Sequence, residues 1–283
     1  MFVAVNRIRC KASVLFRGYK QQMATEDVKY NEAVQTLNEM QCNRMLTSQQ
    51  KMNGMGLVVM RELLHRINIS NDDLNQLKII HITGTKGKGS TCAFVDNILR
   101  KHGVKTGFYS SPHLLEVRER IRVNGRPIST DLFTQYFWEV FDLLKLTEHN
   151  YEVKVPSYFY MLTALALYVF KHEHVSATIL EVGIGGAYDC TNVVPNPVCC
   201  GVASLGLDHT DLLGNTLGEI AWQKGGIFKR GATAFTVPQP DEGMKVLHQR
   251  ADEVGADLKV APPLESYPMG KGLPLGLSGD HQM

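Results

Sequence analysis

Apolar and polar residues alternate along the chain in two rhythms, and each rhythm predicts one kind of element. Apolar residues three to four positions apart predict helices, which we expect at residues 29–43, 56–68, 90–103, 129–145, 156–173 and 216–228. Short runs of small, β-branched and apolar residues predict strands, which we expect at residues 77–84, 104–112, 176–183, 198–206 and 232–237. The pattern weakens from about Pro238, although residues 250–260 fit one more helix and strand.

The order of these elements predicts the fold class. Strands alternate with helices, which is typical of an α/β fold with a doubly wound, mainly parallel sheet. Ligands of such sheets bind beyond the carboxyl ends of the strands. Four polar clusters follow predicted strands, at residues 84–90, 110–112, 181–186 and 208–209. We therefore expect the four clusters to share one edge of the sheet and to form the functional site.

Composition narrows the class of protein without identifying it. The 283 residues are 44% hydrophobic and 20% charged, which is ordinary for a globular protein, and the net charge of +2 gives no reason to expect nucleic acid as a partner. The longest apolar run, residues 161–170, is too short for an integral membrane segment. The six cysteines fit neither a zinc site nor a disulfide framework, which favours free thiols in a reducing compartment.

The first 25 residues differ from the rest of the chain. They contain five lysines and arginines and no acidic residue, with apolar residues between the basic ones, and the first acid is Glu26. This composition is typical of a mitochondrial transit peptide, although a basic N-terminus without that role has the same composition. Translation from Met23 would omit this leader, so we hypothesise a second, cytoplasmic form. A single shared N-terminus in the mitochondrial and cytosolic pools would contradict that hypothesis.

The stretch HITGTKGKGSTCAF, residues 81–94, contains a candidate phosphate loop. It departs twice from the common pattern G-x-x-x-x-G-K-[ST], because the first glycine would fall at Ile82 and an extra glycine precedes the serine. A predicted strand leads into it and a predicted helix follows, which is the expected context. Backbone N–H groups and the helix N-terminus would hold phosphate oxygens. The candidate residues are Gly84, Gly87, Lys88, Gly89 and Ser90. The alternative is a glycine-rich turn with solvated lysines.

Five motifs together resemble a known family. The segment GTKGKGS resembles the shortened phosphate loop of the Mur ligase superfamily. The segments GFYSSPHLLEVRERIRVNG, EVGIGGAYDCTN, SLGLDHTDLLGNT and IAWQKGGIFKRG follow in order, and with the loop they resemble the eukaryotic folylpolyglutamate synthase family. The resemblance runs from about Tyr30 to the last residues. Together with the transit peptide that composition predicts at 1–25, it implies a Mur-ligase-like ATP-binding domain at 26–283, without the C-terminal glutamate-ligase domain of that family.

The resemblance also implies an activity. Members of that family use ATP to join L-glutamate to the γ-carboxylate of tetrahydrofolate or its polyglutamates, through an acyl phosphate. It implies Mg²⁺, with a monovalent cation as a further possibility, small molecules as partners, a monomer, and a location in the mitochondrial matrix or at the inner membrane. Without the C-terminal domain, we expect little ligase activity from this chain alone.

Residue roles follow from the same resemblance. Lys88 and Lys224 would be catalytic, with Lys224 at the position that several superfamily members carbamylate, and Ser111, Glu181 and His209 would bind Mg²⁺. The segment SPHLLEVRERI would form a loop beside the folate.

Chemistry alone leaves alternatives at these positions. Glu181 ends a buried strand, where a carboxylate either binds a cation or caps backbone groups. His209 would be a hydrogen-bonding group, because Mg²⁺ prefers oxygen ligands. Ser111 would be a turn serine and Lys224 a solvated helix lysine. The sequence does not distinguish which of three arginines, 118, 120 or 122, contacts a carboxylate of the substrate.

Three other functions stay open at this point. The nearest is dihydrofolate synthase, which performs the same chemistry on dihydropteroate. A second is a catalytically inactive nucleotide-binding fragment, which would bind ATP without transferring glutamate. A third is a P-loop kinase, for which the segment EVGIGGAYDCTN is not a recognisable motif.

Overall fold

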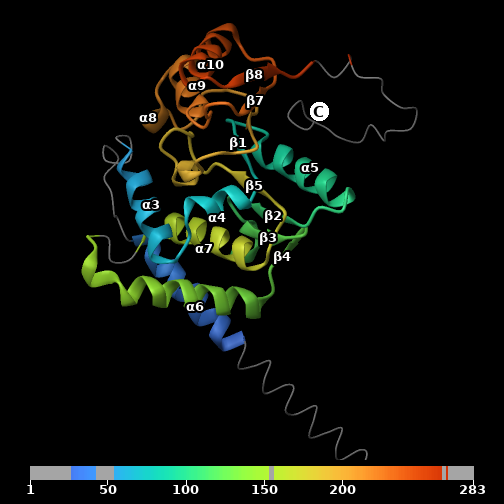
Figure 1. Cartoon of the computed structure of the whole chain (residues 1–283). Helices are drawn as coiled ribbons and strands as arrows, with labels where there is room; N and C mark the ends of the chain where they lie inside the picture. The colour runs from blue at the N-terminus through green and yellow to red at the C-terminus, as the bar shows by residue number, and fades with distance from the viewer. Residues whose placement is uncertain (1–26, 43–53, 153–155, 263–265, 267–283) are drawn as a thin grey trace, which may run out of the picture.

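A central sheet organises the chain in a computed structural model, which describes residues 27–42, 54–152, 156–262 and 266. The sheet has eight strands in the order β4-β3-β2-β5-β1-β6-β7-β8 (Figure 1). Strands β2, β5, β1, β6, β7 and β8 pair in parallel, and β3 and β4 add an antiparallel edge. The strands are β1 Ile79–Thr83, β2 Thr106–Tyr109, β3 Ile121–Val123, β4 Arg126–Pro127, β5 Ala177–Glu181, β6 Cys199–Val202, β7 Thr233–Thr236 and β8 Asp257–Val260. The predicted α/β class with a mainly parallel sheet is confirmed.

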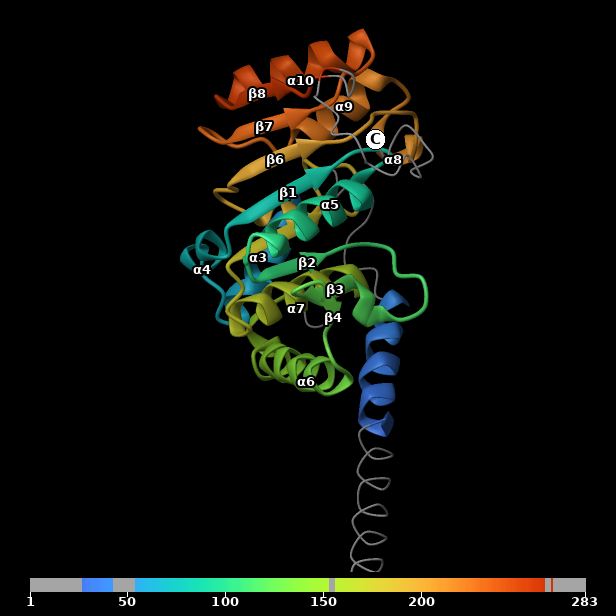
Figure 2. The ribbon, with the colours of Figure 1, turned by 90° about the vertical axis from the view of Figure 1, so that its right-hand side faces the viewer.

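Helices pack against this sheet. They are a helix over residues 27–39, α3 Met55–Arg66, α4 Asn71–Gln76, α5 Lys88–Lys101, α6 Thr130–Leu146, α7 Tyr158–His172, α8 Thr210–Leu213, α9 Leu217–Gly225 and α10 Asp241–Val254. Short 3₁₀ helices lie at η1 Met40–Cys42, η2 Val117–Arg120, η3 Glu148–Asn150 and η4 Cys190–Val193. In Figure 2, α5 lies in front of the sheet, while α9 and α10 pack behind the strands β6 to β8.

Burial of apolar side chains holds these helices against the sheet. Helix α7 is apolar around its whole circumference, and every residue from Tyr160 to Phe170 is buried between the sheet, α3 and α6. The amphipathic helix α6 buries one aromatic face on this core, including Phe133 and Phe137. A smaller cluster around Cys92 holds α5 against β1, β2 and β5. Burial of apolar surface, at about 25 cal/mol per Å², is the main stabilising contribution.

Several elements were not predicted from the sequence. Helix α4 has six residues, too few for a periodic pattern, and its capping box between Ser70 and Asp73 defines its start. Helix α10 begins at Asp241, well before the expected residue 250. Its start was not predicted, because the helix buries only three residues and two of them are small: Gly243, Leu247 and Ala251. The β3–β4 hairpin and α8 were also missed, since each spans only a few residues.

The structure tests the expectations for the cysteines and for a membrane-spanning segment within the residues that it describes. The cysteines that it places, Cys92, Cys190, Cys199 and Cys200, are free thiols. Among the described helices, none has both the length and the apolar character needed to cross a bilayer. The expected leader, residues 1–25, and most of the segment after residue 262 lie outside the described residues.

Candidate functional site

The predicted phosphate loop lies between β1 and α5 and is fixed on both sides. The Thr85 and Lys86 backbone N–H groups donate to the Ser204 carbonyl at 2.8 and 3.2 Å. On the other side, the Thr83 hydroxyl donates to the Gly185 carbonyl at 2.6 Å. The loop is therefore held by the segments that follow β6 and β5, the two neighbours of β1 in the sheet.

The start of α5 has the features of an anion site. Gly87 is the N-cap residue and has a left-handed conformation with φ 82°, which favours glycine. No side chain caps this helix, so its first N–H groups and its dipole face the loop. The Lys88 ammonium donates to the Gly84 carbonyl at 2.9 Å and lies within the loop. The helix begins at Lys88, two residues before the expected start, so both Lys88 and Gly89 belong to its first turn.

Glu181 lies beside this helix N-terminus at the end of β5. Its side chain is buried, and a Cβ added at Gly89 would lie 3.6 Å from Oε1. The Ser111 N–H donates to Oε2 at 3.3 Å. Among the described residues, no lysine or arginine forms an ion pair with Glu181. Burial raises the pKa of this carboxyl, although the Ser111 N–H and the charge of Lys88 oppose the shift.

The other two predicted metal ligands lie at the same edge. Ser111 follows β2 and His209 follows β6, and both line one cavity together with Lys88. His209 has a left-handed backbone and a half-exposed side chain, and its Nε2 lies 3.9 Å from Asp208. The structure therefore brings the four predicted polar clusters to the carboxyl ends of β1, β2, β5 and β6.

The side chains at this edge fit a hard cation whose coordination shell is completed by phosphate oxygens of a bound nucleotide. A carboxylate and a hydroxyl are suitable for Mg²⁺, which binds proteins through one or two carboxylates and completes its shell with phosphates and water. Within the described part of the chain, no three His, Cys, Asp or Glu side chains converge as a metal site. Glu181 is thus the central candidate ligand, and the site needs oxygen atoms from a phosphate to be complete.

Lys224 approaches the phosphate loop from α9. Its side chain is buried, and its Nζ donates to the Gly84 carbonyl at 2.9 Å. Gly84 thus accepts from both Lys224 and Lys88. Burial, and then the charge of Lys88, lower the pKa of Lys224 to about 7. The reading of Lys224 as a solvated lysine is wrong, because this amine is buried beside the candidate phosphate site.

A cavity of about 540 Å³ extends from Lys88 away from the loop. One wall is aromatic and comes from the start of α7 and the segment after β5: Phe159, Tyr160 and Tyr188. Asp189 and Gln223 add polar groups. Sequence reasoning missed these residues because aromatic residues at the start of an apolar helix look like core. The cavity joins a site for anions to a surface suited to a flat ring.

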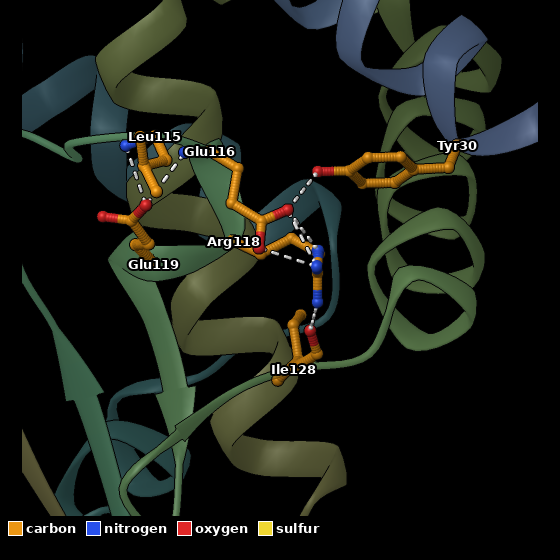
Figure 3. Close-up of polar contacts among 6 residues, drawn as sticks. All are labelled: Tyr30, Leu115, Glu116, Arg118, Glu119 and Ile128. Atoms are coloured by element: carbon orange, nitrogen blue, oxygen red, sulfur yellow. Dashed lines mark hydrogen bonds and ion pairs between the residues drawn. The ribbon is translucent and has the colours of Figure 1, made fainter. Parts of the chain in front are cut away.

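The three arginines left open by the sequence have different positions. Arg120 lines the cavity and donates through Nε to His113 Nδ1 at 2.9 Å. Arg118 is bound to Glu116 and to the Ile128 carbonyl outside the cavity (Figure 3). Arg122 donates to the Glu119 carbonyl and lies over the Phe108 ring. Of the three, Arg120 is the one placed to meet a ligand in the cavity.

Comparison with known proteins connects this geometry to a family. No family model matches the sequence. The curated mitochondrial folylpolyglutamate synthase of Bos taurus is 53% identical over 262 residues, which cover 90% of this chain and 45% of that protein. An FPGS complex with AMPPCP and folate superposes with a TM-score of 0.74 at 29% identity, over 82% of this chain and 53% of that one.

A second solved structure adds a divalent metal. A bifunctional folylpolyglutamate synthase/dihydrofolate synthase with Mn, AMPPNP and L-glutamate bound superposes with a TM-score of 0.63 at 34% identity. That match covers 72% of this chain and 47% of the other chain. The present chain therefore spans about half the length of the curated relatives and solved structures that it matches.

Proposed function

Because this chain is homologous to the eukaryotic folylpolyglutamate synthase family, we propose that it binds ATP for the addition of L-glutamate to a folate. The acceptor is the γ-carboxylate of tetrahydrofolate or of its polyglutamates. The observation that carries the proposal is Glu181, a buried carboxylate without an ion-pair partner among the described residues, beside the uncapped N-terminus of α5. Dihydrofolate synthase is not favoured, because these relatives carry the folylpolyglutamate synthase name.

The chemistry needs activation of a carboxylate. The folate γ-carboxylate oxygen attacks the γ-phosphorus of ATP, which breaks the bond to the bridging oxygen and gives an acyl phosphate and ADP. The amine of glutamate then attacks the acyl carbon, loses a proton, and phosphate leaves with the former carboxylate oxygen. No side-chain nucleophile is required, so this chain's residues act by position and charge.

The residues divide this work. The first turn of α5, with Gly87, Gly89 and Ser90, and the ammonium of Lys88 would hold the phosphates. Glu181, Ser111 and His209 would hold Mg²⁺, which when bound neutralises charge on the phosphoryl group.

The aromatic wall of the cavity would receive the folate. Phe159 and Tyr188 offer apolar surface for its ring system, and Arg120 is placed to meet a carboxylate. This arrangement would bring the folate carboxylate toward Lys88, which lines the same cavity.

An isotope experiment tests the proposed function. The protein is isolated from cells in its natural form. It is then incubated with Mg²⁺, ATP, glutamate and tetrahydrofolate that carries ¹⁸O in its γ-carboxylate. The acyl phosphate route transfers one ¹⁸O atom to each phosphate released. Unlabelled phosphate formed together with glutamylated folate would contradict this route, and ATP hydrolysis without glutamylation would contradict the function.

We also propose that the Lys224 amine is carbamylated by CO₂. CO₂ reacts with a neutral amine, and the pKa of Lys224 near 7 leaves much of it neutral at neutral pH. Since this pKa lies below that of the unfolded chain, the unfolded chain binds more protons between pH 7 and 10.5, and stability rises with pH across this window.

¹³C NMR with labelled bicarbonate tests the modification. We expect a carbamate carbon signal that grows as the pH rises through the pKa of Lys224 and is absent in Lys224→Arg. The matched control is Lys229→Arg, because Lys229 is half-buried and burial also lowers its pKa, but its ammonium donates to Asn192 instead. An equal signal in Lys224→Arg would contradict the proposal.

The relatives' names support a wider proposal about where the protein acts. Because the mammalian relatives are called mitochondrial, we propose that this protein acts in mitochondria, with a cytoplasmic form from Met23. N-terminal sequencing of both pools tests this. We also propose a monomer, which a dimeric mass in light scattering would contradict.

A further inference from the structure

The loop between β2 and β3 projects into solvent but is closely bonded within itself. Its ends line the cavity through Ser111 and Arg120. At its tip, Leu114 and Leu115 are 90% and 92% exposed. The Glu119 carboxylate accepts three backbone N–H groups, from residues 114, 115 and 116, at 2.8 to 2.9 Å. These bonds lower the pKa of Glu119 to about 2, so the carboxylate is charged at neutral pH.

A second set of contacts connects this loop to the rest of the molecule (Figure 3). The Arg118 guanidinium donates to both oxygens of Glu116 at 2.7 and 2.8 Å, and to the Ile128 carbonyl at 2.6 Å. Ile128 immediately precedes Ser129, the N-cap of α6. Arg118 therefore joins the loop to the start of α6.

Tyr30 completes the connection from a distant part of the sequence. It lies on the helix over residues 27–39, and its ring packs edge-on against Phe133 of α6 at 5.6 Å. The Arg118 guanidinium lies over the same ring, 5.5 Å from its centre. The Tyr30 hydroxyl donates to Glu116 at 3.5 Å. Burial raises the pKa of Tyr30, so the hydroxyl keeps its proton and acts as the donor.

We propose that Tyr30 is a positioning residue for the folate: it fixes Glu116 and Arg118, and so holds the loop of residues 113–119 in the shape that the folate meets. The proposal rests on the proposed function for the identity of the ligand. Its physical basis is independent of the ligand, because the ring and the hydroxyl of Tyr30 join the helix to Arg118 and Glu116 of the loop. Loss of the ring removes this connection, while the loop keeps its internal bonds, the contact of Arg118 to Ile128 and the buried Val117 side chain. Loop order, and with it folate affinity, should then fall without a change at the phosphate loop.

Hydrogen exchange measures, without any ligand, how far Tyr30 restrains the loop of residues 113–119. In Tyr30→Leu, the amides of residues 114–116 are expected to exchange about 5- to 30-fold faster, since a hydrogen bond to a charged group and a cation–π contact are lost. Tyr30→Phe keeps the ring and should lie between wild type and Tyr30→Leu. The matched control is Tyr136→Leu, which removes a buried tyrosine that donates to Glu173 and packs on Tyr168. Equal loosening of the loop in the control, or none in Tyr30→Leu, overturns the proposal.

Equilibrium binding then tests the consequence for the ligand. We expect Tyr30→Leu to weaken tetrahydrofolate binding about tenfold, in line with the loosened loop, and to leave Mg·ATP binding unchanged. A loosened loop with unchanged folate affinity overturns the positioning role. Weakened binding of both ligands also overturns it, because it indicates general destabilisation. If the wild-type protein binds no folate, the proposed function fails and folate is excluded as the ligand, whereas the exchange result still decides whether Tyr30 braces the loop.

Discussion

Replacement of Lys88 by alanine is expected to weaken ATP binding by about 10- to 150-fold, because one hydrogen bond to a charged group contributes roughly 1.5–3 kcal/mol. The effect should be specific to the β and γ phosphates. AMP has neither, so its weak binding should change little in the variant. The measurement is calorimetric titration of wild type and variant with ATP and AMP.

The loop offers a matched control for this variant. Lys86 lies two residues earlier, carries the same charge, and is exposed, while its backbone N–H rather than its side chain holds the loop to Ser204. Lys86→Ala is therefore expected to bind ATP like the wild-type protein, apart from a small screened effect of charge. Equal losses in Lys86→Ala and Lys88→Ala would show that general charge, rather than the position of Lys88, attracts the nucleotide.

Replacement of Glu181 by glutamine is expected to change stability and binding in opposite directions. Burial raises the pKa of Glu181 above its usual value. The folded protein therefore binds more protons than the unfolded chain above about pH 4.5, and stability falls as the pH rises through that window. Glutamine keeps the shape but removes the buried charge, so the variant should unfold at a higher temperature at neutral pH. Its Mg²⁺-dependent gain in ATP affinity should fall at least about tenfold, because the charged ligand is lost.

Glu219 provides the control for the stability half of that result. Its carboxylate accepts N–H groups from Asn215 and Thr216 at the start of α9, and these bonds lower its pKa. Glu219→Gln should therefore lower the melting temperature at neutral pH. A lower melting temperature in Glu181→Gln, together with unchanged Mg²⁺ dependence, would show that Glu181 is a structural capping group.

The edge of the sheet could be predicted because local sequence specifies it. Parallel strands are short apolar runs, and the polar residues that follow them must lie at one edge. The predicted position of Glu181, Ser111 and His209, at the same edge of the sheet as the loop, is the one that the structure has. Their roles as metal ligands came from resemblance to a family, and remain proposals.

The aromatic wall and the arginine in the cavity could not be predicted in the same way. Phe159 and Tyr160 belong to an apolar helix, and only the packing of α7 against the sheet decides which aromatic residues face the cavity. The three arginines alternate in sequence, but a 3₁₀ turn and then a strand direct each to a different partner. Tertiary contacts, such as Arg118 with Ile128, decide their roles.

Lys224 shows the same limit for a buried charge. Sequence places it on a helix with glycines after it, where a lysine is normally solvated. The packing of α9 under the loop buries it, because Gly186 and Gly226 allow close approach of the backbones: a Cβ at Gly226 would lie 2.3 Å from the Ala187 Cβ. Burial then lowers its pKa, which no local pattern encodes.

The most direct test of the account is the Mg²⁺ dependence of ATP binding to this chain. Equilibrium dialysis is performed with labelled ATP, once with excess Mg²⁺ and once with a chelator. The account predicts saturable binding at one site, tighter with Mg²⁺, because Glu181 shares the cation with the phosphates at the start of α5. Absence of saturable ATP binding, or binding that the chelator leaves unchanged, would contradict the assignment of this edge of the sheet as a Mg·ATP site.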